Sequence, residues 1–251
     1  MINLEEWILY LLVVRIDSSY INGIQLYDNT LIHMPRLKKF TFSIITIVLI
    51  ENKEIKLDLT SNENIQRSFI GRGYGQIGSY VHYEPTVAVG RCHIYSLPYQ
   101  FENFFDLNNS YHFQDAVFDK VQCLKMYDIR PFEDKFFKLT SIHFPSLKEL
   151  HIRNMQSQKD KQHSSALIIF PHIILLNLLE AHDDYVEQFL LNKKTHLLCL
   201  LDVCIRYESF ANLTNNFTND TTWFNCSQLK RLHTDGPFVR PKAFQKYFLV
   251  L

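Results

Sequence analysis

The segment FPSLKELHIRN (residues 144–154) places Leu147, Leu150 and Ile152 at the spacing LxxLxI, after a proline and before a polar residue. This spacing is typical of a short strand whose alternate side chains are buried on one face of a sheet. A single unit of this kind buries too few apolar side chains to offset the entropy of ordering its backbone, about 1–2 kcal/mol per residue. The pattern should therefore recur along the chain.

The LxxLxI pattern does recur, at a nearly constant interval. Its copies begin at Leu11 and Leu37 in the first part of the chain, and at Val121, Leu147, Ile173, Leu200 and Leu229 in the second. The five later copies are spaced by 26, 26, 27 and 29 residues. This regularity predicts an α/β fold, a leucine-rich-repeat-like solenoid with parallel strands on one face and helices on the other.

The segments between the copies predict the helices. PFEDKFFKL (131–139) and DDYVEQFLLNKK (183–194) are the clearest, the second with Asp183 or Asp184 as its N-cap. FENFFDL (101–107) and YESFANLTNNF (207–217) are weaker members of the same set. In the first of these we expect Phe101, Phe104 and Phe105 to form the core of a repeat helix.

We expect one leucine-rich-repeat-like domain over residues 1–251, with its most regular repeats at 121–235 and an irregular insertion at 43–90. Within the insertion, residues 43–60 predict an antiparallel hairpin that turns at 51–53. The polar, glycine-rich residues 61–80 predict a long loop. RCHIYSLPY (91–99) then predicts a strand that Pro98 ends.

Charge and cysteine content narrow the range of partners and compartments. Lysine plus arginine and aspartate plus glutamate number 26 each, so no nucleic acid or anionic membrane is expected as a partner. The longest apolar tract (166–181) is interrupted by Pro171, His172 and Asn177 and is shorter than the roughly 20 residues of a membrane helix. The five cysteines are odd in number and lack CxxC spacing, which favours neither a disulfide framework nor a zinc site.

Five N-x-S/T triplets would favour a secreted protein, in which they would carry glycans. They begin at Asn108, Asn212, Asn216, Asn219 and Asn225. The N-terminal residues, however, lack the basic n-region of a signal peptide. We therefore interpret the triplets as polar loop composition and expect a cytoplasmic or nuclear protein.

No motif in the chain points to catalysis, a cofactor or a metal. GYGQIG (73–78) spells GxGxxG, but Pro85 and a strand-like segment follow it where a dinucleotide fold needs a helix, so we expect a flexible loop. The eleven histidines show neither HxxxH nor HxH pairing, and no nucleophile–base set is apparent. We expect a protein that is not an enzyme and holds no cofactor or metal.

The residues that alternate with the inward positions of each copy form a candidate protein-binding face. They are Lys39, Thr41, Lys125, Tyr127, Glu149, His151, Arg153, Asn177, Asp202, Arg206, Arg231, His233 and Asp235. The set mixes both charge signs with hydrogen-bonding and aromatic groups, as protein-binding surfaces do. The alternative interpretation is an ordinary solvated face.

Several longer phrases add a family resemblance to this pattern. They are YINGIQLYDNTLIHMPRLKKF, GRCHIYSLPYQFENFFDLNN, DKVQCLKMYDIRPFEDKFFKL, FPSLKELHIRN and SQLKRLHTDGPFVRP. Together they resemble the C-terminal portion of F-box proteins with degenerate leucine-rich repeats. In that family an N-terminal F-box docks on the Skp adaptor of a cullin-based ubiquitin ligase, and the repeats capture the substrate.

The resemblance implies a protein-interaction module that reads an unknown protein substrate for a ubiquitin ligase. The F-box itself is not found in the sequence, so a Skp-type adaptor is an expected partner only if an F-box lies upstream. The alternative is a free-standing repeat scaffold, or a truncated paralogue, with no link to ubiquitin.

Overall fold

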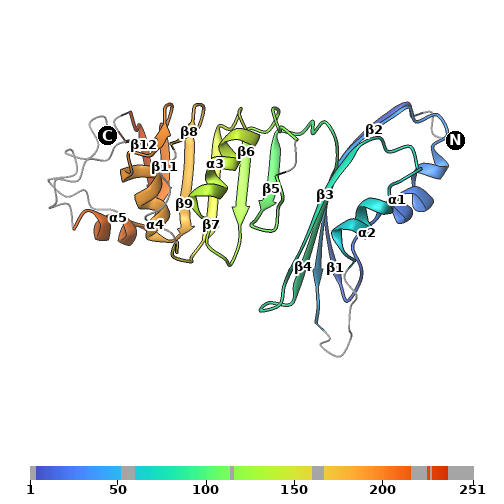
Figure 1. The fold of residues 1–251 in the computed structure, drawn as a ribbon, viewed down its shortest axis with the longest axis horizontal. Coiled ribbons are helices and arrows are strands. Elements are labelled where there is room, and N and C mark those ends of the chain that lie inside the picture. Colours follow the sequence, from blue (N-terminus) through green and yellow to red (C-terminus); the bar gives the residue numbers. More distant parts are fainter. Residues whose placement is uncertain are drawn as a thin grey trace. The chain divides into compact units, whose positions relative to one another are not determined.

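The computed structural model describes residues 4–51, 60–113, 116–159, 167–215, 225–226 and 228–236. It divides the chain into two compact units, an N-terminal unit (Met1–Gln100) and a C-terminal unit (Phe101–Leu251) (Figure 1). Both are mixed α/β units in which strands dominate over helices, and both contain parallel strand pairs. The expectation of one repeat domain over residues 1–251 stays a prediction.

The N-terminal unit is built on a sheet with the strand order β1-β2-β4-β3 in the described residues, which we call the N-terminal sheet. Its strands are β1 (Glu6–Ile16), β2 (Lys39–Leu49), β3 (Ile77–Glu84) and β4 (Val89–Ser96). β1 and β2 run parallel over their whole length, whereas β4 pairs antiparallel with both β2 and β3. The β-branched residues of β2 suit this central position.

One face of the N-terminal sheet packs against short helices. They are α1 (Gly23–Asn29), the 3-10 turn η1 (Leu31–His33) and α2 (Asn62–Arg67). Phe42, Ile44 and Val48 from β2 form a buried cluster with Leu26 of α1 and Ile65 of α2. The core of this unit therefore lies between β2 and the helices.

The predicted insertion at 43–90 is an integral part of the N-terminal unit. β2 pairs with β1 and β4, and the second strand of the hairpin predicted at 43–60 lies almost wholly outside the described residues. The predicted loop at 61–80 is wrong at both ends, because α2 begins at Asn62 and β3 begins at Ile77. Gly73 and Gly75 between them adopt positive φ, as a loop requires. Gly78 lies in β3, so a strand follows the GxGxxG segment and no helix opens there.

The C-terminal unit carries an all-parallel sheet with the order β12-β11-β9-β7-β6-β5 in the described residues, which we call the C-terminal sheet. Its strands are β5 (Asn103–Leu107), β6 (Cys123–Tyr127), β7 (Glu149–Asn154), β9 (Leu175–Ala181), β11 (Asp202–Ile205) and β12 (Arg231–Thr234). Figure 1 shows them side by side in chain order, from green β5 to red β12.

The register of the C-terminal sheet reproduces the spacing of the LxxLxI copies. Leu150 pairs with Leu124 on one side and Leu176 on the other, and Leu176 pairs with Val203. All four side chains are completely buried. The first positions of the copies that begin at 121, 147, 173, 200 and 229 are buried as well. The predicted strands from Val121 onward are therefore confirmed, with the predicted residues inward.

A repeated backbone contact fixes where each strand begins. The carbonyl just before one strand accepts hydrogen bonds from two successive N–H groups at the start of the next, at 2.7–3.1 Å; we call it the entry carbonyl. The entry carbonyls belong to Glu102, Gln122, Lys148, Ile174 and Leu201, and Glu5 makes the same contact between β1 and β2. Parallel strands thus enter both sheets in the same way.

The helices of the C-terminal unit agree with the prediction in three of its four segments. They are α3 (Asp134–His143), α4 (Asp183–Val186) continued by the π-helical η2 (Glu187–Leu191), and α5 (Tyr207–Leu213). The N-cap of α4 is His182, whose Nδ1 accepts from the Asp184 N–H at 3.2 Å, rather than Asp183 or Asp184. Beside these helices, β8 (Ile168–Phe170) and β10 (Thr195–Leu197) form a separate parallel pair.

The fourth predicted helix, at 101–107, is wrong, because this segment forms β5. Phe104 pairs in register with Leu124 and is buried, as a strand residue of the sheet. Its ring packs edge-on against Phe118 and Phe144, which lie on the helical side of the sheet. Phe105 and Phe101 are half-buried and do not belong to a helix core.

None of the helices in the described residues has the length and apolar character needed to cross a membrane.

Candidate protein-binding face

The two faces of the C-terminal sheet differ in burial. Along β6 and β7 the inward residues, such as Leu124 and Leu150, are buried, whereas the alternating outward residues are half-buried or exposed. We call this second side, formed by the outward residues of the C-terminal sheet, the open face. Parallel sheets are ordinarily covered on both faces and read as continuous apolar runs. Within the described residues, the alternation seen here marks a parallel sheet with one face left to solvent or to a partner.

Most of the predicted face residues lie together on the open face. Lys125, His151 and Asn177 pair in one row across β6, β7 and β9. Tyr127 and Arg153 pair in the next row, and Glu149, Arg231 and His233 also point outward from their strands. Lys39 and Thr41 belong to β2 in the N-terminal unit, where Lys39 is exposed and Thr41, against expectation, is buried.

Three further predicted residues are engaged in contacts within the C-terminal unit. Asp202 is buried, and both of its carboxylate oxygens accept from the Arg231 guanidinium at 2.5 Å. The hydrogen bonds and charge of Arg231 hold the pKa of Asp202 below its usual value. Arg206 donates to the Ala181 carbonyl at 3.0 Å, and the Asp235 carboxylate accepts from the Tyr207 N–H at 3.0 Å. These groups stabilise the ends of the strands rather than project freely.

Two cation–aromatic pairs occupy the open face near its β5 edge. The Lys125 ammonium lies 4.8 Å from the centroid of the Phe105 ring, and the Arg153 guanidinium lies 5.3 Å from that of Tyr127. Arg153 also forms an ion pair with Glu180 at 2.7 Å. Such contacts hold long side chains in fixed positions before a partner arrives. Sequence reasoning missed Phe105, because the segment that contains it was assigned to a helix.

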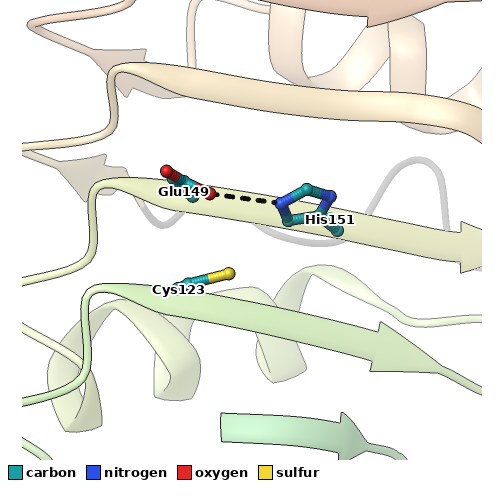
Figure 2. Close-up of side chains that lie close together, drawn as sticks. All are labelled: Cys123, Glu149 and His151. Carbon is teal, nitrogen blue, oxygen red and sulfur yellow. Dashed lines mark ion pairs between the residues drawn. The ribbon is translucent and has the colours of Figure 1, made fainter. Parts of the chain in front are cut away.

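A second group on the open face combines a thiol, a carboxylate and an imidazole. One ligand atom from each of Cys123, Glu149 and His151 lies within 4.8 Å of the other two. Figure 2 shows Glu149 and His151 on β7 beside Cys123 on β6. The Glu149 carboxylate oxygen lies 3.6 Å from His151 Nε2. Among the residues that the structure describes, this is the one group of three or more such side chains that could hold a metal ion.

The environment of this group shifts the pKa values of two of its members, Cys123 and His151. Burial raises the pKa of the Cys123 thiol to about 11, and the negative charge of Glu149 acts in the same direction. Burial lowers the pKa of His151 and the Lys125 ammonium adds to the lowering, whereas the nearby Glu149 carboxylate opposes it. Both groups are therefore neutral at pH 7 when no metal is bound.

The sequence contained a signal for this group that a search for His and Cys motifs could not detect. Glu149 lies 26 residues after Cys123, which is the interval between the copies that begin at Val121 and Leu147. The repeat spacing therefore predicts that the two residues are neighbours across β6 and β7, as the register confirms. Ligand sets built across strands in this way are found by aligning the repeats.

Comparisons with known proteins found nothing: no family model, no curated protein and no solved structure matches this chain.

Proposed function

We propose that this protein binds another protein through the open face, and that its C-terminal unit is a leucine-rich-repeat-like solenoid. The observation that carries the proposal is a parallel sheet whose outward residues on β6 and β7 are mostly polar or aromatic and are not covered as the inward ones are. Repeat solenoids are the architecture that leaves the strand side of a parallel sheet available for a partner.

The ends of neighbouring strands support the repeat interpretation. Asn108, Asp128 and Asn154 follow or end β5, β6 and β7, and all three are buried. In each, a side-chain oxygen accepts from the backbone N–H two residues later, at 2.9 Å. The Asn154 amide also donates to the carbonyl of Arg130, which follows the neighbouring strand β6, at 2.6 Å. Equivalent positions thus carry equivalent contacts from one strand to the next, as stacked repeats require.

The cation–aromatic pairs support a protein partner. Tyr and Arg are enriched among the residues that dominate binding energy at protein interfaces. Tyr127 and Arg153 provide one of each in contact, flanked by Glu180, while Lys125 on Phe105 extends the same patch. Because Arg153 and Glu180 already pair, a partner meets a surface of balanced charge. We therefore expect contact through aromatic and hydrogen-bonding groups rather than through net charge.

Within this proposal, the resemblance to F-box proteins assigns the partner to the substrates of a cullin-type ubiquitin ligase. A Skp-type adaptor would then bind only through an F-box upstream of residue 1. The alternative is a free-standing interaction scaffold, which binds partners through the same face without any ligase subunit.

The proposal is tested by affinity purification of tagged 1–251 from cells, with cross-linking and quantitative mass spectrometry. Tyr127→Ala and Arg153→Glu on the open face should each reduce recovery of the partners at least tenfold. Such a loss corresponds to about 1.4 kcal/mol, an ordinary value for a central interface residue. Lys138→Glu is the matched control, because Lys138 is exposed on α3, away from the open face. Partner recovery that is unchanged in both open-face variants would exclude this face as the binding surface.

A second arm separates the ligase from the scaffold. The chain is expressed with any in-frame upstream segment of its native transcript, and the recovered proteins are searched for adaptor and cullin subunits. Adaptor recovery that needs the upstream segment supports the ligase assignment. Partners recovered without ligase subunits, and without change in their half-lives on overexpression, support the scaffold.

A further inference from the structure

We propose that Cys123, Glu149 and His151 bind a transition-metal ion of the zinc class on the open face. This inference does not depend on the proposed function, since it rests on the side chains of β6 and β7 alone.

The backbone places the three donors on one side of two adjacent strands. Glu149 and His151 are two residues apart on β7, so their side chains leave the same face of the sheet. Cys123 pairs directly with Glu149 in the parallel register. Metal–ligand bonds of about 2.0–2.3 Å in a tetrahedral site set the donors roughly 3.3–3.8 Å apart. The donors here lie within 4.8 Å of one another, so small side-chain rotations suffice.

One donor atom lacks a hydrogen-bond partner among the described residues. His151 Nε2 is buried and neither accepts nor donates a hydrogen bond within that part of the chain, and the Glu149 oxygen at 3.6 Å is too far to provide one. A buried polar atom without a partner costs free energy, and native proteins rarely leave one. Coordination of a metal by Nε2 would satisfy this atom, since a neutral imidazole nitrogen is a common metal ligand.

The charges of the site have one favourable and one opposing part. A Cys123 thiolate and the Glu149 carboxylate together balance a divalent cation. The Lys125 ammonium opposes the ion, because Lys125 pairs with His151 in the register. However, its Nζ lies over the Phe105 ring at 4.8 Å, on the β5 side of the site. We therefore expect Lys125 to weaken the site without abolishing it.

The donor set selects the class of ion. Thiolate and imidazole favour Zn²⁺ and related transition metals, whereas Mg²⁺ and Ca²⁺ require oxygen ligands. Three protein ligands leave a fourth tetrahedral position for water or an incoming donor. Glu149 is half exposed, so that position is accessible from solvent.

The test uses purified, reduced, metal-free 1–251 titrated with Co²⁺ and with Zn²⁺. Co²⁺ should bind at one equivalent with a thiolate-to-metal charge-transfer band and intense visible bands typical of tetrahedral geometry, and Zn²⁺ should displace it. Cys123→Ser should remove the charge-transfer band, and Glu149→Gln and His151→Gln should each weaken Zn²⁺ binding at least tenfold. Lys125→Met should tighten it.

Cys204→Ser is the matched control, because Cys204 is also a half-buried outward cysteine on the same sheet, in β11. It should leave the spectrum and the affinity unchanged. Circular dichroism confirms that the variants are folded, which is expected because all the substituted residues point outward. Absence of a charge-transfer band in the wild-type protein, or a band that survives Cys123→Ser, would overturn the proposal.

Discussion

Replacing Leu150 with alanine tests whether the C-terminal unit is held together by a continuous ladder of inward residues. Leu150 is completely buried in β7 and pairs with Leu124 and Leu176 on its two sides. The substitution removes three carbon groups at about 0.8 kcal/mol each, or about 2.4 kcal/mol, before the cavity is counted. Since neighbouring strands on both sides resist collapse into the space, we expect a total loss of about 3–4 kcal/mol.

Leu232→Ala supplies the comparison, because Leu232 occupies the equivalent position of β12 and is half-buried. In the described residues, β12 pairs with β11 on one side only. With part of its surface already in water, its loss should cost about 1–1.5 kcal/mol. The measurement is urea unfolding of 1–251 followed by circular dichroism. Hydrogen exchange with mass spectrometry assigns the transition to peptides of the C-terminal unit. A loss below about 1.5 kcal/mol for Leu150→Ala, or equal losses for the two variants, would refute the idea that the inward residues stabilise this unit as a continuous ladder.

Two further predictions concern buried polar side chains. Burial lowers the pKa of His93 from 6.5 to about 3, so the folded protein binds fewer protons than the unfolded chain and loses stability as the pH falls below 6.5. Between pH 7 and pH 5 the free energy of unfolding should fall by about 2 kcal/mol through this group. His93→Gln should abolish that loss, whereas His233→Gln, at an exposed site, should not. Equal acid sensitivity of the two variants in urea unfolding would contradict this prediction. The buried Asn225 side chain makes three hydrogen bonds to backbone groups at 2.6–3.1 Å. In the same assay, Asn225→Ala should therefore lower the free energy of unfolding by about 2–4 kcal/mol. Asn212→Ala, at an exposed site, should lower it by less than about 0.5 kcal/mol.

The strands of the C-terminal sheet could be predicted because their signal is local and repeated. Each copy of LxxLxI fixes which residues are inward, and the interval between copies fixes which residues pair. β5 escaped this reasoning, because Phe104 and Phe105 beside acidic residues resemble a helix face as much as a strand. What distinguishes them is the pairing of Phe104 with Leu124, a contact between distant residues that the segment does not encode.

The N-terminal sheet shows a different limit. β4 lies between β2 and β3, so its neighbours are set by antiparallel pairing over long sequence separations. No interval in the sequence signals that arrangement, so the sequence alone predicts an insertion in this region. The open face was predicted as a set of outward residues, but the contacts between them, such as Arg153 on Tyr127, depend on side-chain directions that spacing cannot provide. Burial of Thr41 and Asp202 likewise follows from their neighbours.

The entry carbonyls have a consequence for how this chain can change. Because each one fixes the start of the next strand, the point at which pairing begins does not depend on the length of chain between strands. The interval between entry contacts is shorter from Glu102 to Gln122 than from Leu201 to Lys230, yet the entry hydrogen bonds are the same at both. Additions and deletions between strands therefore alter the helical side and leave the open face in place. The two sides of the unit can evolve separately, one by changes in length and the other by single substitutions.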